Sequence, residues 1–317
     1  VFIKLVSENN TEGFGEPSPY ITSPKNLVKI IEKIYLKHFQ KKNLNISYVK
    51  QLKKNSQNNL LNLILPAFDQ AIFEIYSKEK NKGVSKLLSK KSLLNLDCYA
   101  SGGMFFEGRN YQKMLTEAVE SKKKGYLGYK YRPPMPKNNL SHQQRIKNPP
   151  PLDIKTIEIF SSKLRAKLGS KFKIMIDLGC RCKDIKDTKY LFEMFKEHNY
   201  YFVEEPFKRD FKSYEILNKI KTKINIAGGE HINNIQQFYN WNKKKFFDFF
   251  QPDTNLMLFS EINLMINKIG HEKIILHNWC NKINFLSNIN LAFSLKKKVL
   301  IEKNIIPNPY DNFFNTS

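Results

Sequence analysis

The chain has 317 residues, which is too long for a single small module and suits one large α/β domain with a smaller companion. Hydrophobic residues make up 41% of it, which argues against disorder, and no apolar run approaches the roughly 20 residues that a membrane span needs. Lysine and arginine outnumber aspartate and glutamate by 53 to 29, so the formal net charge is +24.

A basic balance of this size raises nucleic acid or an anionic membrane as a partner. However, only six of the 53 basic residues are arginine, the preferred bidentate reader of phosphates and bases, and the lysines are spread along the whole chain. We therefore interpret the charge as compositional, and expect no membrane partner and no nucleic-acid partner. The four cysteines form no C-x-x-C pair, which indicates reduced, buried thiols in a cytoplasmic protein.

The first 90 or so residues predict a small α+β unit. Residues 1–7 predict a strand, residues 9–15 a turn, and residues 16–20 a loop that contains two prolines. Because the chain begins without methionine and inside this first strand, we expect further residues to precede Val1.

Two helices follow in the same unit. Ser23 is a plausible N-cap, and Pro24 suits the first helical position of a stretch whose apolar residues recur at helical spacing. A second helix is predicted over Leu60–Lys78, and Pro66 should either kink it or mark its start.

From about residue 95, short apolar runs alternate with amphipathic, lysine-rich stretches, a pattern typical of βα units and a parallel sheet. Strands are predicted at 94–100 and 125–131, and six later runs each end at a polar residue. The ends are 23 to 27 residues apart, about one βα unit of a (β/α)₈ barrel. They are Asp177, Glu204, Glu230, Asp253, His277 and Glu302.

In such barrels the carboxyl ends of the strands meet at one mouth, where the chemistry takes place. One carboxylate after a strand is ordinarily a plain loop residue, but six polar side chains at regular spacing predict a site. Lys130 and Arg132 lie two residues apart on a strand and therefore face the same side, so both cations can point into the barrel.

The connection from Arg132 to Asp177 is about 20 residues longer than its neighbours and is rich in proline. We expect an excursion near the mouth of the barrel. Its role as a lid, an oligomer contact or a specificity loop stays open.

The predicted site combines three kinds of group. The carboxylates of Asp177, Glu204 and Glu230 are hard oxygen ligands that suit Mg²⁺, whereas zinc favours histidine or thiolate. Asp253 can orient His277 and raise its basicity. With cations beside them, these groups suit removal of the proton α to a carboxylate.

These motifs together resemble the enolase superfamily, in its mandelate racemase-type subgroup. The resemblance runs along almost the whole chain. It rests on Gly13-Phe-Gly-Glu16, Ala67-Phe-Asp-Gln-Ala71, Lys130-Tyr-Arg132, Asp177, Val203-Glu-Glu-Pro206, Gly228-Gly-Glu230, Gln251-Pro-Asp253, His277-Asn-Trp279, Glu302 and Pro307-Asn-Pro309.

The resemblance implies an α/β fold with a modified TIM (β/α)₇β barrel at 94–303. An α+β capping domain would cover 1–93 and be completed by 304–317, with its own first strand and a flexible loop before Val1. It also implies a small-molecule carboxylate substrate and a homo-oligomer. Asp177, Glu204 and Glu230 would bind one Mg²⁺ per active site.

The resemblance also implies roles for the remaining residues. Lys130, with Arg132 beside it, would neutralise the substrate carboxylate, and Glu302 would hydrogen-bond it. His277, oriented by Asp253, would act as general base and then acid.

Three residues near these motifs have their own interpretations. Glu205 would point outward and be structural. Tyr20 could contact substrate or belong to a proline-rich turn, and Trp279 could line the pocket or pack between barrel and helix.

Two positions depart from the family pattern. Gly179 stands where the family often has Asn, which affects local hydrogen bonding. Arg132 replaces the second lysine, the second base of family racemases, and arginine stays protonated.

Because dehydration needs only one base, we predict a dehydratase that converts a sugar acid into a 2-keto-3-deoxy acid. The alternatives are a racemase or epimerase acting through the same enediolate, and a non-catalytic, basic nucleic-acid-binding protein.

Overall fold

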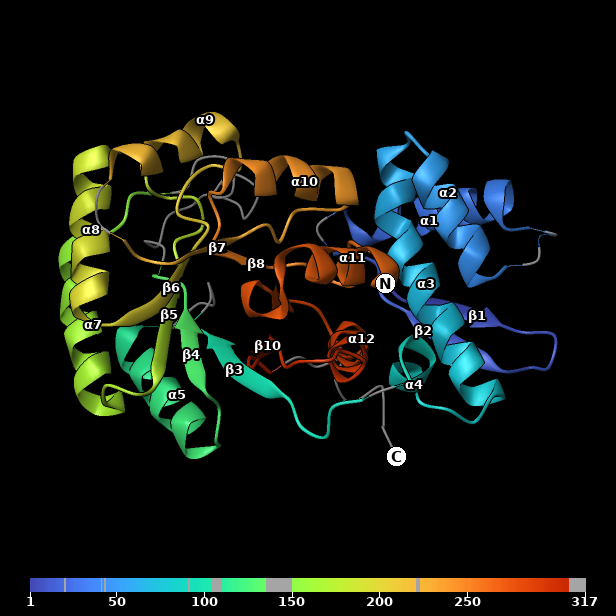
Figure 1. Cartoon of the computed structure of the whole chain (residues 1–317), viewed down its shortest axis with the longest axis horizontal. Helices are drawn as coiled ribbons and strands as arrows, with labels where there is room; N and C mark the ends of the chain where they lie inside the picture. The colour runs from blue at the N-terminus through green and yellow to red at the C-terminus, as the bar shows by residue number, and fades with distance from the viewer. Residues whose placement is uncertain are drawn as a thin grey trace.

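The structure is a computed structural model that describes residues 1–19, 21–40, 42, 44–90, 92–103, 110–134, 150–220 and 223–307. A parallel β-barrel surrounded by helices occupies one side of the molecule, and a smaller unit of helices and one hairpin occupies the other (Figure 1). No helix within the described ranges is long and apolar enough to cross a membrane.

Eight parallel strands build the barrel in the order β8-β7-β6-β5-β4-β3-β10-β9. A parallel bridge between Phe250 and Ile274 brings the two edges together, so the predicted TIM-type barrel is confirmed. The strand before Asp253 is only two residues long, Phe249–Phe250. The strands are β3 (Asp97–Gly102), β4 (Gly128–Tyr131), β5 (Lys173–Asp177), β6 (Tyr200–Glu204), β7 (Ile226–Gly228), β8 (Phe249–Phe250), β9 (Ile275–Leu276) and β10 (Leu300–Asn304).

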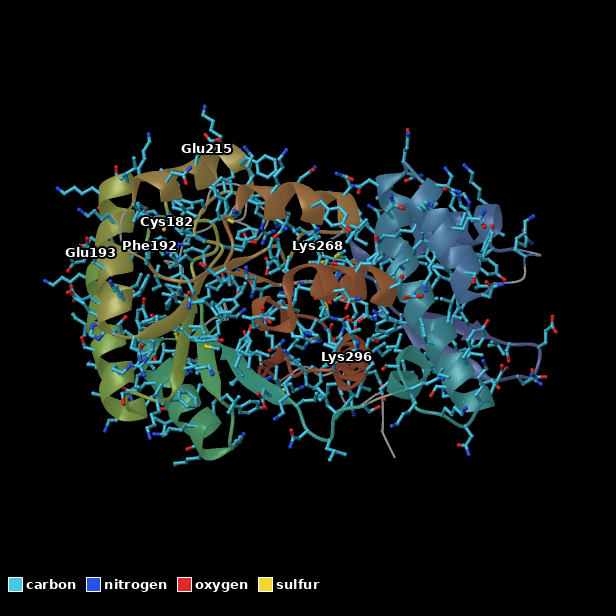
Figure 2. All side chains as sticks on the ribbon, in the orientation of Figure 1. Cys182, Phe192, Glu193, Glu215, Lys268 and Lys296 are labelled. Atoms are coloured by element: carbon cyan, nitrogen blue, oxygen red, sulfur yellow. The ribbon has the colours of Figure 1, made fainter. Side chains whose placement is uncertain are left out.

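Helices cover the outside of this barrel, as the alternation of apolar and lysine-rich stretches predicts (Figure 1). On α8, Glu193 points away from the barrel while the neighbouring Phe192 is 1% exposed (Figure 2). The helices are α5 (Tyr111–Lys123), α7 (Ile154–Leu168), α8 (Ile185–Glu197), α9 (Phe211–Tyr214), α10 (Ile235–Lys244), α11 (Phe259–Ile269) and α12 (Lys282–Phe293), with 3₁₀ turns η1 (Glu215–Lys219) and η2 (His271–Lys273).

Short polar side chains decide where several of these helices begin. Asn110, Asp153 and Asp184 occupy the N-cap positions of α5, α7 and α8, and each side chain accepts a backbone N–H from the first turn. Such caps satisfy donors that would otherwise lack a partner at a helix start.

The barrel interior has an apolar layer below a polar one. Met175 and Phe202 belong to a buried cluster with Tyr99, Ala227 and Ile275. Two residues further along the chain from Tyr99, Met175, Phe202 and Ile275, the side chains are polar. Because strand residues two apart share a face, Asp177 follows Met175 and Glu204 follows Phe202 on the inward side. The apolar layer therefore forms the floor of the candidate site.

The smaller unit contains one antiparallel hairpin packed on helices. Its core gathers apolar side chains from the first 76 residues together with Leu258 of the barrel. The helix predicted after Ser23 is confirmed, with Ser23 at the N-cap position, whereas α2 and α4 were not predicted. The elements are β1 (Ile3–Val6), β2 (Glu12–Gly15), α1 (Pro24–His38), α2 (Ile46–Asn55), α3 (Asn59–Glu79) and α4 (Val84–Leu88).

The long helix α3 continues through Pro66, so this proline does not mark the start of the helix. A proline has no N–H to donate to the carbonyl four residues earlier, here that of Asn62. The buried ammonium of Lys53 donates to that carbonyl at 2.9 Å and also to the carbonyl of Leu256 at 3.0 Å. A cation from α2 therefore replaces the missing helical hydrogen bond and ties the smaller unit to the barrel.

We propose that the capping domain covers residues 1–93 and the barrel residues 94–303. Separate apolar clusters support the division, because the core of each unit is drawn almost entirely from its own residues. The expected completion of the capping domain by 304–317 falls mostly outside the described residues, since 308–317 are not among them.

All four cysteines are free thiols, as expected. Cys182 and Cys280 are buried, but Cys98 and Cys180 are only half-buried, so the prediction of four buried thiols is wrong for these two.

Replacing Gly15 by alanine is expected to separate β2 from α3. A Cβ at Gly15 would lie 1.7 Å from the carbonyl oxygen of Ala67, and backbone cannot move aside as a flexible side chain can. We expect a loss of about 3 kcal/mol in the free energy of unfolding, measured by urea denaturation. Gly83→Ala is the control, because its nearest neighbour would lie 3.8 Å away; an equally small effect at both positions would contradict the close packing.

Asp69 on α3 is expected to make stability depend on pH. It is 1% exposed, and burial raises its pKa from 3.8 to about 7, even though Phe259 N–H donates to Oδ2. Folding therefore favours the protonated carboxyl. This stabilisation is complete below pH 4 and is lost progressively between pH 4 and pH 7, on the order of 4 kcal/mol in all.

The Asp69→Asn variant tests this expectation. Asparagine keeps an acceptor for the Phe259 N–H and has no charge to bury, so its midpoint of thermal unfolding should fall less than that of the wild type between pH 4 and pH 7. Other titrating groups are common to both proteins and cancel in the difference. Parallel curves for the two proteins would show that Asp69 does not titrate in this range.

Candidate active site

The six polar strand ends lie together at the carboxyl end of the barrel. Asp177 and Glu204 are direct partners in the register of β5 and β6. Glu230 and Asp253 follow β7 and β8, His277 follows β9 at once, and Glu302 lies within β10. Their side chains are mostly buried, with Glu230 the most accessible at 15%. The structure thus brings together what the spacing of the chain predicts.

Lys130 lies deep in the barrel between two glutamates. Its Nζ is 2.6 Å from Glu204 Oε2 and 2.7 Å from Glu302 Oε1, and the residue is 4% exposed. Although burial disfavours the ammonium, the two carboxylates raise the pKa of Lys130 well above its usual value. Burial raises the pKa of Glu204 to about 8 in spite of Lys130, whereas Lys130 and His277 outweigh burial and lower that of Glu302. Lys130 thus has protein carboxylates as its immediate partners.

Arg132 follows β4 and pairs with Asp177. Its Nε donates to Asp177 Oδ2 at 2.7 Å, and its Nη2 contacts the same oxygen. Burial opposes the charge, but Asp177 and Glu230 raise the pKa of the guanidinium further. The backbone N–H of Gly179 donates to Asp177 Oδ1 at 2.8 Å, so main chain supplies a hydrogen bond at this departure from the family pattern.

His277 and Asp253 form the predicted pair. Nδ1 of His277 lies 2.6 Å from Asp253 Oδ2, and Nε2 lies 3.1 Å from Glu230 Oε2. Burial opposes protonation of the imidazole, but Glu302, Asp253 and Glu230 together raise the pKa of His277 well above its usual value. In this arrangement both ring nitrogens face a carboxylate, Nδ1 that of Asp253 and Nε2 that of Glu230, so the protonated imidazole is favoured and His277 is suited to act as an acid. For His277 to act as a base, another cation must neutralise the charge of Glu230.

Arg209, which no sequence motif indicates, contacts Glu230 through Nη2, and its Nε lies 3.4 Å from Glu205 Oε2. Burial opposes the charge of Glu230, yet Arg209 and His277 hold the pKa of this carboxyl well below its usual range. Arg209 lies in the loop between β6 and α9, where no periodic pattern points to a site.

Glu205 turns away from the barrel interior, but it is not a solvent-facing residue. Its backbone φ is 40°, so the strand alternation used to predict its direction ends here. It is 1% exposed and accepts hydrogen bonds from Gly229 N–H at 3.0 Å and the Tyr214 hydroxyl at 3.2 Å. Arg209 Nε lies 3.4 Å from Glu205 Oε2 and His231 Nδ1 lies 3.5 Å from Glu205 Oε1, so these three residues form a polar cluster next to the site.

Gln251 is a further inward-facing residue that was not predicted. Its Nε2 donates to Glu204 Oε2 at 2.7 Å, and the residue is fully buried. The signal was present in the sequence, because Gln251 lies two residues before Asp253 at the end of β8.

The structure gives less information on the two remaining predicted residues, Tyr20 and Trp279. Tyr20 lies outside the described residues, as does most of the long connection after Arg132. Trp279 is half-buried and lies two residues after His277. From the near end of that connection, the carbonyl of Pro133 accepts a hydrogen bond from Arg181 at 2.9 Å.

The three predicted magnesium ligands have the right donor chemistry but are paired with protein cations. Glu204 Oε1 is buried and has no hydrogen-bond partner among the described residues, as expected of an oxygen kept for another ligand. Nevertheless, within the described ranges no three His, Cys, Asp or Glu side chains form a ready ligand cluster. The oxygens fit a hard divalent cation, whose binding requires Arg132 and Arg209 to release Asp177 and Glu230.

Comparison with known proteins places this chain in a family. The family model described as "Enolase C-terminal domain-like" matches residues 113–315. Among curated proteins, none matches the chain significantly.

Solved structures of the superfamily share the fold. An enolase superfamily member from Polaromonas sp. JS666 is 20% identical, with a TM-score of 0.83 over 99% of this chain and 81% of that chain. The 3,6-anhydro-D-galactonate cycloisomerase from Zobellia galactanivorans is 19% identical, with a TM-score of 0.79 over 98% and 83%. A protein from Zymomonas mobilis ZM4, provisionally named a dehydratase, is 18% identical, with a TM-score of 0.77 over 96% and 81%. The chain therefore belongs to the enolase C-terminal domain-like family and is a member of the enolase superfamily.

Proposed function

We propose that this protein is a Mg²⁺-dependent dehydratase of sugar acids. The observation that carries the proposal is the asymmetry of the two candidate bases. His277 has an imidazole that can gain and lose a proton, whereas the other position holds Arg132, a guanidinium paired with Asp177. Racemisation through two opposed bases needs a second proton acceptor there, while dehydration does not.

Asp177, Glu204 and Glu230 are the residues that would hold the metal. When bound, Mg²⁺ would polarise the substrate carboxylate and offset the charge that develops on it. Arg132 adds positive charge beside the substrate, and Glu302 offers a hydrogen-bonding oxygen. Lys130 acts on the substrate indirectly: its ammonium pairs with the carboxylates of Glu204 and Glu302 and stabilises their charge.

His277 then performs both proton transfers. The neutral Nε2 takes the proton from Cα, and the electron pair of that bond enters the enediolate. The imidazolium next gives the proton to the β-hydroxyl, which leaves as water while the Cα–Cβ double bond forms. Tautomerisation of the resulting enol gives the 2-keto-3-deoxy acid, so atoms and charge balance. Asp253 holds Nδ1 throughout and keeps Nε2 directed at the site.

A screen of mono- and diacid sugars with Mg²⁺, with 2-keto acid detected by semicarbazide, tests the proposal. We expect a hit that EDTA removes and that the His277→Asn variant lacks. The relative named a cycloisomerase acts on a sugar acid, 3,6-anhydro-D-galactonate, which supports this class of library. Solvent deuterium at Cα without keto acid would instead indicate a racemase or epimerase.

A further inference from the structure

A chain of hydrogen bonds links the capping domain to the side chain of Asp253. It begins at Glu16, which directly follows β2 and is 2% exposed. Its carboxylate faces the first turn of α12, the helix that lies between the barrel and the smaller unit (Figure 1).

Glu16 acts as the cap of a helix that belongs to the other unit. Oε1 accepts hydrogen bonds from the backbone N–H of Asn281 at 2.9 Å and from its Nδ2 at 2.6 Å, and Oε2 accepts the N–H of Asn284 at 3.1 Å. Asn281 occupies the N-cap position but makes no cap hydrogen bond of its own. A carboxylate at this place accepts backbone N–H groups that have no partner within the helix, and its negative charge interacts favourably with the positive end of the helix dipole.

Asn284 carries the connection into the site. It is fully buried, and its Nδ2 donates to Asp253 Oδ1 at 2.8 Å while its Oδ1 accepts the Thr254 hydroxyl at 2.9 Å. The other oxygen of Asp253 holds His277 Nδ1 at 2.6 Å. One turn further along α12, Asn288 donates to the carbonyl of His277 at 2.9 Å. Both members of the pair are therefore held by the inner face of one helix.

A second contact fixes Glu16 itself. Its N–H donates to Gln70 Oε1 on α3 at 2.9 Å, and Gln70 Nε2 donates to the carbonyl of Thr254 at 2.8 Å. The capping domain thus holds both the start of α12 and the segment that carries Asp253. A buried asparagine destabilises a folded protein unless its polar atoms form hydrogen bonds. The side chain of Asn284 forms these bonds with Asp253 and Thr254, which lie next to the site.

We propose that Glu16 and Asn284 are positioning residues that fix the orientation of the His277 imidazole through Asp253, so that docking of the capping domain sets the proton-transfer geometry. The orientation follows from the hydrogen bonds alone, whereas its effect on turnover rests on the proposed function. Neither residue touches the reacting atoms.

The orientation can be measured without a substrate. In protein labelled with ¹⁵N-histidine, the Nδ1–H of His277, assigned by its absence in His277→Asn, should be a sharp, strongly downfield NMR signal because Asp253 holds it. The Asn284→Leu variant removes the donor to Asp253 and should broaden or abolish the signal. The milder Glu16→Gln variant, which loses one acceptor at the start of α12, should broaden it partially.

Two controls separate positioning from general damage. Asn290→Leu changes an asparagine of the same helix that donates to the carbonyl of Leu286, and Glu12→Gln changes an exposed glutamate of β2; both should keep the wild-type signal. An unchanged His277 signal in folded Asn284→Leu and Glu16→Gln proteins would overturn the proposal, whatever reaction the enzyme catalyses.

With a substrate in hand, Glu16→Gln should lower kcat about tenfold or more while KM changes less than about twofold, because a displaced base slows proton transfer more than binding. A rise in KM alone would place Glu16 in substrate binding and contradict its positioning role.

Discussion

Replacing His277 by asparagine is expected to lower the rate of proton removal from Cα by about a thousandfold or more. General acid–base groups contribute about a hundredfold to ten-thousandfold, and here one imidazole serves both transfers. Asparagine keeps a similar polar volume but accepts no proton at neutral pH. The measurement is exchange of the Cα proton in D₂O, followed by proton NMR with the acid found in the screen.

Two further variants make this result specific. Asp253→Asn keeps the shape next to Nδ1 but removes the charge that stabilises the imidazolium, so its rate should fall between those of the wild type and His277→Asn. His271→Asn, in η2 and away from the site, should exchange at the wild-type rate. Retention of exchange by His277→Asn would assign the base to another residue.

Replacing Lys130 by methionine is expected to destabilise the protein by about 3 to 5 kcal/mol at pH 8. The substitution leaves the buried carboxylates of Glu204 and Glu302 without their shared cation, and an uncompensated buried charge costs far more than the pair contributes. Because a carboxyl can avoid this cost by taking up a proton, the loss should be smaller at pH 5. Urea denaturation at the two pH values measures the difference.

Comparison with an exposed ion pair tests the physical reason. Lys4 and Glu12 lie 2.9 Å apart, but the lysine side chain is 52% exposed, so Lys4→Met should cost less than about 1 kcal/mol. Adding Glu302→Gln to Lys130→Met should restore part of the stability, because it removes the carboxylate whose negative charge Lys130 stabilised. A small loss in Lys130→Met at both pH values would mean that solvent reaches this cluster.

The strand ends could be predicted because their signal is local and periodic. Asp177, Glu204 and Glu302 each end a short apolar run, and parallel strands bring such ends to one edge of a barrel. Gln251 follows the same alternation and could have been found from the sequence. Arg209 could not, since it lies in a loop whose path depends on packing.

The pairing of charges also depended on tertiary structure. The sequence places Lys130 and Arg132 on one face, but not which carboxylate each would contact. In the structure Lys130 lies between Glu204 and Glu302, and Arg132 contacts Asp177. These partners come from strands far apart in the chain, so they depend on the barrel register.

The sequence by itself determined the class of fold and the set of polar strand ends, because spacing and apolar periodicity are properties of the chain. Only the tertiary structure decided how Pro66 is accommodated, through Lys53, and how Glu16 reaches the first turn of α12. Glu16 and Asn284 are 268 positions apart in the chain, and Lys53 and Asn62 lie on different helices, so no local pattern encodes their meeting. Close packing of two units determines it, and with it the orientation of His277.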